Sequence, residues 1–384
     1  MKILFDTQIF KAQKYGGISR YFSELFYYFN TIENITYQAP IRDTENEYLK
    51  NIRPFFEKDL SRKSFLKPNT KIKRKIIKLI EAFDKNSNIN LVKRALKEQN
   101  FDIFHPTYYS PYFLKYLKNK PFVLTVYDMI HETYPEYFKL DFGKTVAYKK
   151  KLIQKATKIV AISENTKRDI IKHYNVPDEK IQVIYLGNSL KPTTNKQFNI
   201  PNLPQNYILF VGARGNYKNF IFFIESISEL LNNDKNLNIV VGGGYSKQNN
   251  FSKKEIDLFE KLKIKEQIFQ YSMDDDSLAY LYQNAKCFVF PTLYEGFGIP
   301  VLEAFACDCP AVLSNTSSLP EIGGGAALYF DPLNNKSILE TVRKVLNDEN
   351  LRQDLILRGR EQLKKFSWEK TSKETLELYY DILK

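Results

Sequence analysis

The stretch Cys287-Phe-Val-Phe-Pro-Thr-Leu-Tyr-Glu-Gly-Phe-Gly-Ile-Pro-Val-Leu-Glu-Ala-Phe-Ala306 contains a strand, a loop and a helix start in direct succession. Its first four residues, Cys287–Phe290, are a short apolar run of the kind found in buried strands. Pro300 suits the first turn of a helix, so a helix over Val301–Ala306 is predicted. A strand followed at once by a loop and a helix is the repeating unit of an α/β sheet.

The loop of this stretch carries residues suited to binding a phosphorylated ligand. Gly296 and Gly298 let the backbone approach a ligand closely. The N-terminus of the following helix offers free N–H groups and a positive dipole end to a phosphate. Glu295 lies in the loop, and Glu303 lies in the first helical turn, where its carboxylate can accept hydrogen bonds from a vicinal diol such as a ribose. The alternative is an ordinary turn before a capped helix.

Short apolar runs alternate with amphipathic stretches along the whole chain. The strand candidates are Lys2–Phe5, Ile103–His105, Phe122–Tyr127, Lys158–Ile162, Ile181–Tyr185, Tyr207–Val211, Asn238–Val241, Cys287–Phe290, Ala311–Ser314 and Ala327–Phe330. The helix candidates are Arg20–Phe29, Leu91–Glu98, Lys144–Lys155, Glu164–His173, Phe220–Leu231, Leu278–Ala285, Val301–Ala306 and Ser337–Leu346. This alternation predicts an α/β fold with parallel sheets.

The alternating pattern restarts once. The polar stretch Asn188–Gln205 carries three prolines and predicts a linker, after which Tyr207 opens a new first strand. We therefore divide the chain into an N-terminal Rossmann-like domain (1–190), a linker (191–205), a second Rossmann-like domain (206–366) and a C-terminal helix (367–384). Such sheets bind ligands at the carboxyl ends of their strands, and two facing sheets enclose a cleft.

Composition limits the classes of function. The 384 residues carry a net charge of +13, which favours an anionic partner such as a nucleic acid, an anionic membrane or a phosphorylated substrate. No apolar run approaches the roughly 20 residues that span a bilayer, and the N-terminus lacks the apolar region of a signal peptide. Three cysteines predict neither a disulfide framework nor a four-ligand metal site. A reducing, cytoplasmic location is expected.

A basic stretch with an apolar side lies at residues 58–83. Such a segment suits peripheral contact with anionic lipid on the inner face of the cell membrane. It equally suits a solvated surface helix that docks on its own domain. The residues leave both interpretations open.

The stretch Tyr294–Ala306 resembles the E-x7-E signature of retaining GT-B glycosyltransferases, glycosyltransferase family 4 in particular. The resemblance implies the GT-B fold, which has two Rossmann-like domains facing a cleft and a C-terminal helix crossing back to the first domain. In that family the first glutamate contacts the hydroxyls of the donor sugar and the second holds the ribose. These roles are carried to Glu295 and Glu303, with Gly296–Gly298 against the donor sugar and diphosphate.

Two further elements agree with a donor site. Arg214 and Lys218 lie four residues apart, where the first strand of the second half meets a helix. Cations held there stabilise the negative charge that develops on a leaving nucleoside diphosphate. Gly16 and Gly17 resemble the family's glycine pair, whose backbone N–H reaches the donor phosphate. The alternatives are two surface cations and a flexible turn.

The strand ending at Val126 departs from the family pattern. Many relatives end it in His-Asp, and the histidine contacts the donor sugar, whereas this chain has Tyr127 followed by Asp128 and, three residues later, His131. The resemblance implies that Asp128 or His131 orients the donor sugar or the acceptor hydroxyl. A capping aspartate beside a structural histidine is the alternative.

The rest of the implied donor site is more scattered. Ser272 and Met273 lie where relatives line the base pocket. The other residues assigned to the donor site are Gly212, Phe297 and Leu302. The acids at 274–276 are predicted to cap a helix rather than to bind a metal, and 242–244 lacks a complete dinucleotide-binding pattern. No metal and no cofactor is expected.

The resemblance implies transfer of a sugar from a nucleoside diphosphate to an acceptor hydroxyl with retention of configuration. The segments Gln8–Arg20 and Tyr127–Phe138 look most like bacterial O-antigen and capsule mannosyl- or deoxyhexosyltransferases, so a GDP-linked donor and a glycan or lipid-linked glycan acceptor are expected. The alternatives are a UDP-sugar-dependent transferase and a non-catalytic sugar-nucleotide-binding protein. Nucleic-acid binding is not expected, since no helix has a recognition motif.

Overall fold

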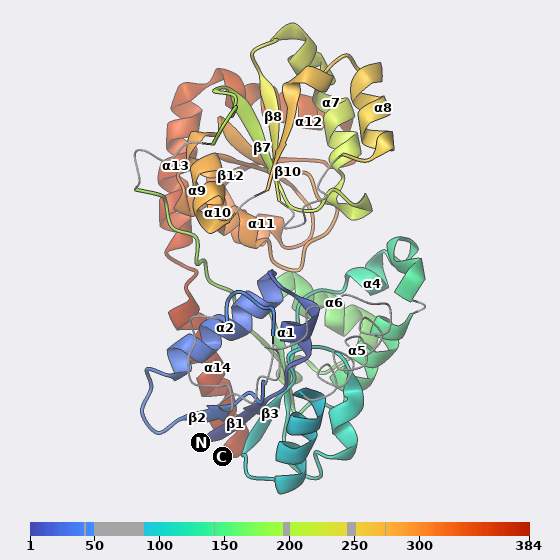
Figure 1. Ribbon diagram of the computed structural model, residues 1–384, viewed down its shortest axis with the longest axis vertical. Coiled ribbons are helices and arrows are strands. Elements are labelled where there is room, and N and C mark those ends of the chain that lie inside the picture. Colours follow the sequence, from blue (N-terminus) through green and yellow to red (C-terminus); the bar gives the residue numbers. More distant parts are fainter. Residues whose placement is uncertain (42–43, 50–87, 142, 195–199, 244–250, 273) are drawn as a thin grey trace, which may run out of the picture.

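The chain folds into two α/β domains, one above the other in Figure 1. The computed structural model describes residues 1–41, 44–49, 88–141, 143–194, 200–243, 251–272 and 274–384. The basic stretch at 58–83 lies outside these residues. Both ends of the chain lie in the lower domain of Figure 1.

The N-terminal domain is built on parallel strands. One group has the order β2-β1-β3 and a second the order β4-β5-β6, and a parallel bridge between Phe104 and Phe122 joins them. The strands are β1 (Lys2–Phe5), β2 (Thr36–Gln38), β3 (Ile103–His105), β4 (Val123–Val126), β5 (Lys158–Ala161) and β6 (Ile181–Val183). All except β2 were predicted. The short β2 lies at the edge of the sheet and buries no residue, so it lacks an apolar signal.

The helices of this domain include α1 (Gln8–Ala12), α2 (Gly17–Phe29), α4 (Ile130–Thr133), α5 (Lys144–Lys155) and α6 (Glu164–Tyr174). Three of them, α2, α5 and α6, begin after a glycine or a capping serine. In α6 the Ser163 side chain accepts a hydrogen bond from the Thr166 N–H and so caps the helix. In α2 the glycine pair forms the helix start, three residues before the predicted Arg20.

The C-terminal domain has one parallel sheet of order β12-β11-β10-β7-β8-β9. Its strands are β7 (Tyr207–Val211), β8 (Asn238–Gly242), β9 (Ile268–Tyr271), β10 (Cys287–Phe290), β11 (Ala311–Ser314) and β12 (Ala327–Phe330). Its helices are α7 (Phe220–Asn233), α8 (Lys253–Lys261), α9 (Asp275–Asn284), α10 (Ile299–Ala306), α11 (Leu319–Gly323), α12 (Asn335–Asn347) and α13 (Glu349–Leu363). The strand order reverses between β7 and β10, and the loop at 291–298 begins at this switch point.

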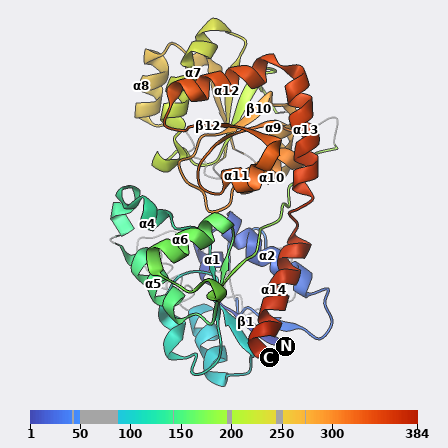
Figure 2. The ribbon, with the colours of Figure 1, turned by 180° about the vertical axis from the view of Figure 1, so that it is seen from behind.

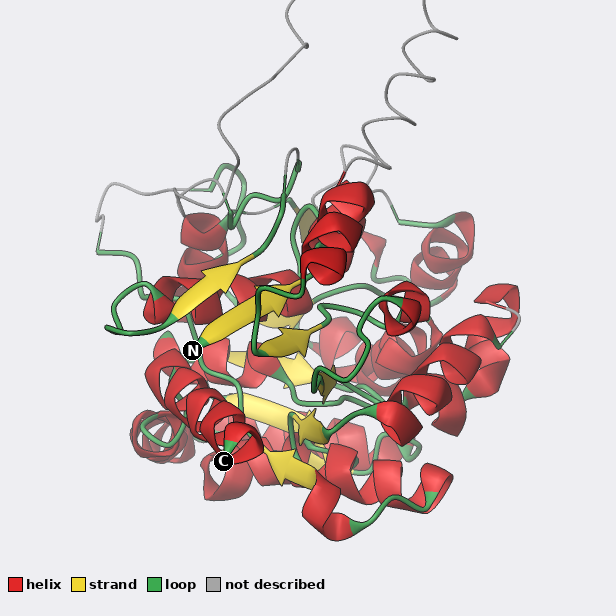
Figure 3. Ribbon diagram, turned by 90° about the horizontal axis from the view of Figure 1, so that it is seen from below, coloured by secondary structure: helices red, strands yellow, loops and turns green. Residues whose placement is uncertain are grey.

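The last helix, α14 (Trp368–Leu383), leaves the C-terminal domain and packs on α2. Figure 2 shows the chain passing from α13 in the upper domain to α14 in the lower one, and Figure 3 shows α14 at the surface of the molecule seen from below. Gly187 lies against the backbone of Trp368, and a Cβ at Gly187 would lie 2.3 Å from the Trp368 nitrogen. The predicted fold, with its returning helix, is confirmed; the domain boundaries at 190, 205 and 366 stay predictions.

A buried histidine fixes α14 to the sheet. The His105 ring is hydrogen-bonded through Nδ1 to the Tyr379 hydroxyl (2.5 Å) and through Nε2 to the Thr125 hydroxyl (2.9 Å). Burial lowers the pKa of His105 to about 3, so the ring stays neutral and uses one nitrogen as donor and one as acceptor. The C-terminal helix is therefore part of the N-terminal core.

Removing the Tyr379 hydroxyl should destabilise the N-terminal domain. In Tyr379→Phe the buried His105 nitrogen loses its partner, which costs about 1–3 kcal/mol. Urea unfolding followed by tryptophan fluorescence measures the effect, since the single tryptophan begins α14. Tyr380→Phe is the matched control, because Tyr380 is 46% exposed. Equal unfolding midpoints for the two variants would contradict this role of Tyr379.

Candidate active site

The loop between β10 and α10 forms one wall of the space between the domains. Gly298 precedes α10 with a φ of 107°, a left-handed conformation that favours glycine, and Pro300 lies in the first turn as predicted. The Ser317 hydroxyl accepts a hydrogen bond from the Glu295 N–H at 2.9 Å. The Ser318 hydroxyl lies 3.0 Å from the Glu295 carbonyl oxygen, to which it donates. These bonds fix the backbone that carries Glu295.

Gly296 touches the N-terminal domain. A Cβ at this position would lie 1.7 Å from the Tyr127 carbonyl oxygen, so only glycine fits. The carbonyl oxygen of Gly296 accepts hydrogen bonds from the hydroxyls of Ser163 (2.6 Å) and Thr166 (3.1 Å). The glycine therefore permits a close approach between domains, while its predicted contact with the donor sugar stays a prediction.

A cavity of about 490 Å³ lies between the domains. It brings together eight of the predicted residues: Gly16, Gly17, Asp128, Glu295, Gly296, Phe297, Gly298 and Glu303. Lining residues that the sequence analysis did not select include Arg20, Tyr48, Tyr217 and Asp275. The Gly16 backbone is hydrogen-bonded to the Tyr48 side chain, and because the first N–H groups of α2 have no partner within the helix, the helix start that begins at Gly17 offers donors at this cavity.

Lys218 is paired with Glu295 at the edge of the cavity. Its Nζ lies 2.6 Å from Glu295 Oε1, and each side chain is 16% exposed. Burial alone would lower the pKa of Lys218, but the Glu295 carboxylate, together with Tyr217, outweighs it and raises the pKa. The sequence analysis selected both residues, but the ion pair between them was not foreseen. Their contact places a cation beside the predicted sugar-binding carboxylate.

Arg214 does not lie beside Lys218 and Glu295 but is paired with another carboxylate. Its Nε donates to Glu255 Oε1 at 2.6 Å, and its guanidinium lies over the Phe251 ring, 4.8 Å from the centroid. Arg214 is absent from the described lining of the cavity. Glu255 belongs to α8, far along the chain, so the spacing of Arg214 and Lys218 carried no signal for this pairing.

Glu303, the second predicted glutamate, also lines the cavity. Its Oε2 accepts a hydrogen bond from the Tyr282 hydroxyl at 3.2 Å. Burial raises the pKa of Glu303 to about 7, although Arg20 and Tyr282 oppose the rise. A carboxyl group with this pKa loses its proton close to neutral pH, and the carboxylate can then accept two hydrogen bonds from a diol.

The opposite wall is formed by the loop after β4. The Tyr127 side chain is buried, and its hydroxyl donates to the Thr107 carbonyl oxygen at 3.1 Å. Asp128 lines the cavity. His131 stacks on Phe138 with ring centroids 4.0 Å apart, burial lowers its pKa, and its Nδ1 is buried without a partner among the described residues. Of Tyr127, Asp128 and His131, only Tyr127 and Asp128 are among the described lining residues of the cavity.

A buried lysine supports this loop. The Lys149 ammonium on α5 donates to the Asp128 carbonyl oxygen and to Glu132 Oε2, each at 2.9 Å. Its side chain is fully buried. Such a charge is stable only when it is paired and hydrogen-bonded, so Lys149 positions the backbone of Asp128. A lysine in a basic helix carried no sequence signal for this role.

Two family profiles match the chain. The family described as "Glycosyl transferases group 1" matches residues 192–362, and "Glycosyltransferase Family 4" matches residues 73–190. The chain is 30% identical over 303 residues to the O-antigen chain mannosyltransferase B of Escherichia coli, an alignment that covers 74% of this chain and 76% of that relative. The protein is a family 4 glycosyltransferase. The predicted family and the predicted transferase activity are thus confirmed.

A second sequence relative and a solved structure also resemble this glycosyltransferase. The O-antigen chain mannosyltransferase RfbU of Salmonella typhimurium is 29% identical over 220 residues, which cover 56% of this chain and 59% of RfbU. The crystal structure of Anabaena HepE in complex with UDP and glucose has a TM-score of 0.71 at 15% identity, covering 98% of this chain and 99% of HepE. HepE therefore shares the fold of the glycosyltransferase.

The remaining predicted donor residues of the glycosyltransferase lie outside the described cavity lining. Gly212 has a φ of 122° and donates its N–H to the Gly242 carbonyl oxygen. Leu302 is fully buried in α10 and Ser272 is exposed. Met273 lies outside the described residues. Their assignment to the donor site stays a prediction.

The acids before α9 cap the helix as predicted. Asp274 accepts a hydrogen bond from the Ser277 N–H at 2.9 Å, and the helix begins at Asp275, three residues before the predicted start.

Within the described residues, no three His, Cys, Asp or Glu side chains group so as to hold a metal ion. In the same part of the chain no helix is long and apolar enough to cross a membrane. The expectation that no metal takes part stays a prediction.

The raised pKa of Glu303 should appear as a pH dependence of stability. The folded carboxyl group has a pKa of about 7 against an ordinary value of 4.5. Between these pH values the folded state binds more protons, so stability falls as pH rises, by at most about 1.4 kcal/mol per pH unit. The change in urea midpoint between pH 5 and pH 7.5 should therefore differ between the wild type and Glu303→Gln. Glu340→Gln, on an exposed side chain, is the control; identical pH profiles for all three proteins would refute the assignment.

Proposed function

We propose that this glycosyltransferase moves a mannose-type hexose or a deoxyhexose from a GDP-sugar to a hydroxyl of a glycan or lipid-linked glycan in bacterial surface polysaccharide synthesis. The supporting observation is the interdomain cavity, which has Glu295 and Glu303 on one side and the Gly16–Gly17 helix start on the other. The O-antigen mannosyltransferases among the relatives support the sugar and the acceptor class.

The proposed roles follow from the chemistry of each group. Glu295 binds hydroxyls of the sugar, Glu303 binds the ribose diol, and the N–H groups at Gly16 and Gly17 bind the diphosphate. Lys218 lies 2.6 Å from Glu295 and stabilises the charge on the leaving diphosphate. Arg214 supplies a second positive charge for the diphosphate when its guanidinium leaves Glu255. In this proposal no metal is required, because these groups supply the positive charge.

The proposed reaction retains the configuration at the anomeric carbon. The acceptor oxygen forms its bond to that carbon on the face from which the diphosphate leaves, and the bond between the carbon and the β-phosphate oxygen breaks. The acceptor proton passes to the leaving diphosphate. Asp128, whose carbonyl oxygen accepts a hydrogen bond from Lys149, or His131 three residues further along the chain, orients the donor sugar or the acceptor hydroxyl.

The proposed place of action is the cytoplasmic face of the membrane, where residues 58–83 contact anionic lipid. A UDP-sugar donor is the second candidate for the same site, because HepE, which shares the fold, was crystallised with UDP and glucose.

A panel of GDP-, UDP- and ADP-sugars tests the proposal through donor hydrolysis and nucleotide release. GDP-mannose or a GDP-deoxyhexose should give the highest turnover. Lys218→Ala should lower turnover with that donor by about 10²–10³-fold, because one electrostatic stabiliser is lost. Lys336→Ala, which removes an exposed lysine of α12, should not. A preference for UDP-sugars would favour the second candidate, and binding without turnover would favour a non-catalytic protein.

A further inference from the structure

Arg20 is a buried cation of the N-terminal domain that reaches the C-terminal domain. It lies in the first turns of α2, where its N–H donates to the Gly16 carbonyl oxygen at 3.0 Å. Its side chain is only 9% exposed, and its terminal nitrogen lies 2.6 Å from Asp275 Oδ2. The Tyr48 ring covers the guanidinium, 4.6 Å from its carbon to the ring centroid. A charge buried to this degree needs partners on every side.

The charges around the cavity point to a function for this side chain. Among the described lining residues the acidic side chains are Asp128, Asp275, Glu295 and Glu303, and Arg20 is the only cation. Lys218 and Arg214 lie outside the described lining and are both paired with carboxylates. A diphosphate in the cavity would therefore meet Arg20 as its first positive side chain.

Arg20 also lines a second cavity, and the two cavities differ in how well they suit an anion. The second cavity has a volume of about 480 Å³ and shares Tyr15, Arg20, Tyr48 and Asp275 with the first cavity. Its other acidic lining residues are Glu24, Glu47, Asp274 and Asp276. This second cavity has five carboxylates, against four in the first cavity, and Gly16 and Gly17 do not line it, so it is the less favourable of the two for a phosphate. The anion is therefore expected on the side where the α2 N-terminus adds N–H donors.

Arg20 lies between the two ends of the expected nucleotide. Gly16 and Gly17 are one helical turn away from Arg20 on the same helix, and Glu303 of the C-terminal domain lines the same cavity as Arg20. In a nucleoside diphosphate the α-phosphate joins the ribose to the β-phosphate. We propose that Arg20 binds the α-phosphate of the donor, a role that rests on the proposed function and on Glu303 as the ribose ligand.

The guanidinium has the chemistry that this role requires. It carries five N–H donors in a planar fork, so it can keep Asp275 on one terminal nitrogen and bind a phosphate oxygen with another. Asp275 and Tyr48 hold the fork in place before a ligand arrives, which lowers the entropy lost on binding. A lysine at this position would offer a single point charge that cannot hold both partners in a fixed geometry.

Binding of a nucleoside, its monophosphate and its diphosphate tests the proposal by titration calorimetry. The series is guanosine, GMP and GDP, or uridine, UMP and UDP if the wild type prefers that base. In the wild type the α-phosphate should strengthen binding. In Arg20→Met the affinity for the monophosphate and diphosphate should fall roughly 10- to 100-fold while that for the nucleoside stays unchanged, because a charge-assisted hydrogen bond is lost. Arg20→Lys should give a smaller loss.

Two controls separate this role from a structural one. Asp275→Asn removes the interdomain ion pair but keeps the guanidinium, so the gain from nucleoside to monophosphate should persist. Lys14→Met removes a cation of the loop before Gly16, where the side chain is 57% exposed, and should leave all affinities near wild type. Equal losses in Arg20→Met and Asp275→Asn, or a loss of nucleoside binding in Arg20→Met, would overturn the proposal. Failure of the proposed function would appear in the wild type itself, as no binding of either series.

Discussion

The two domains meet backbone to backbone at one glycine, and the geometry of the cleft depends on this contact. The Gly296 α-carbon leaves no room for a side chain beside the Tyr127 carbonyl oxygen, and its own carbonyl oxygen is held by two hydroxyls of the other domain. Glu295 and Asp128 are the chain neighbours of these two residues, so both carboxylates face the same cavity. The separation of the two walls is therefore set by the van der Waals radii of main-chain atoms, which cannot be adjusted by a change of rotamer.

Cations near the cleft are arranged as pairs with carboxylates. Lys218 contacts Glu295, Arg214 contacts Glu255 and Arg20 contacts Asp275. Each pair offsets the cost of burying its charges. In such a site, a phosphorylated donor replaces a carboxylate as the partner of each cation. The affinity for the donor therefore depends on how much more strongly the cation binds the phosphate than the carboxylate, and not on the charge of the cation alone. The pairs also keep these side chains ordered close to where the proposed ligand binds.

Local signals in the sequence were sufficient for the fold class and for the loop at 291–298 that lines the cavity, although β2 and β9 were not predicted. Buried strands such as Cys287–Phe290 are apolar throughout, and a helix start such as Pro300 is marked by one residue, so both could be predicted. The features that the sequence did not reveal depend on contacts between distant segments. The partner of Arg214 lies on α8, and Arg20 looks like any surface arginine of an amphipathic helix until α9 lies opposite it. The tyrosine in place of the family's histidine was visible, but the inward direction of its side chain follows from the Thr107 carbonyl oxygen, which no spacing indicates.

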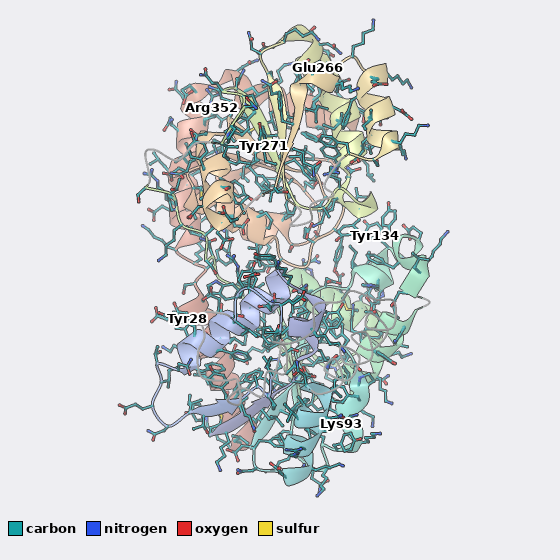
Figure 4. All side chains as sticks on the ribbon, in the orientation of Figure 1. Tyr28, Lys93, Tyr134, Glu266, Tyr271 and Arg352 are labelled. Atoms are coloured by element: carbon teal, nitrogen blue, oxygen red, sulfur yellow. The ribbon has the colours of Figure 1, made fainter. Side chains whose placement is uncertain are left out.

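The return of α14 to the first domain has a consequence for the order of folding. His105, on a strand of the first sheet, finds its hydroxyl partner Tyr379 only after every strand of the second sheet has been synthesised. Figure 4 shows the dense side-chain packing of both domains, with Tyr28 of the lower domain on the side where α14 returns. On the ribosome the C-terminal domain is continuous and can close its sheet as a unit, whereas the N-terminal domain emerges first and lacks the helix that packs on α2 until α14 has been made. In vivo, the domain that is made first is thus the one that is completed last.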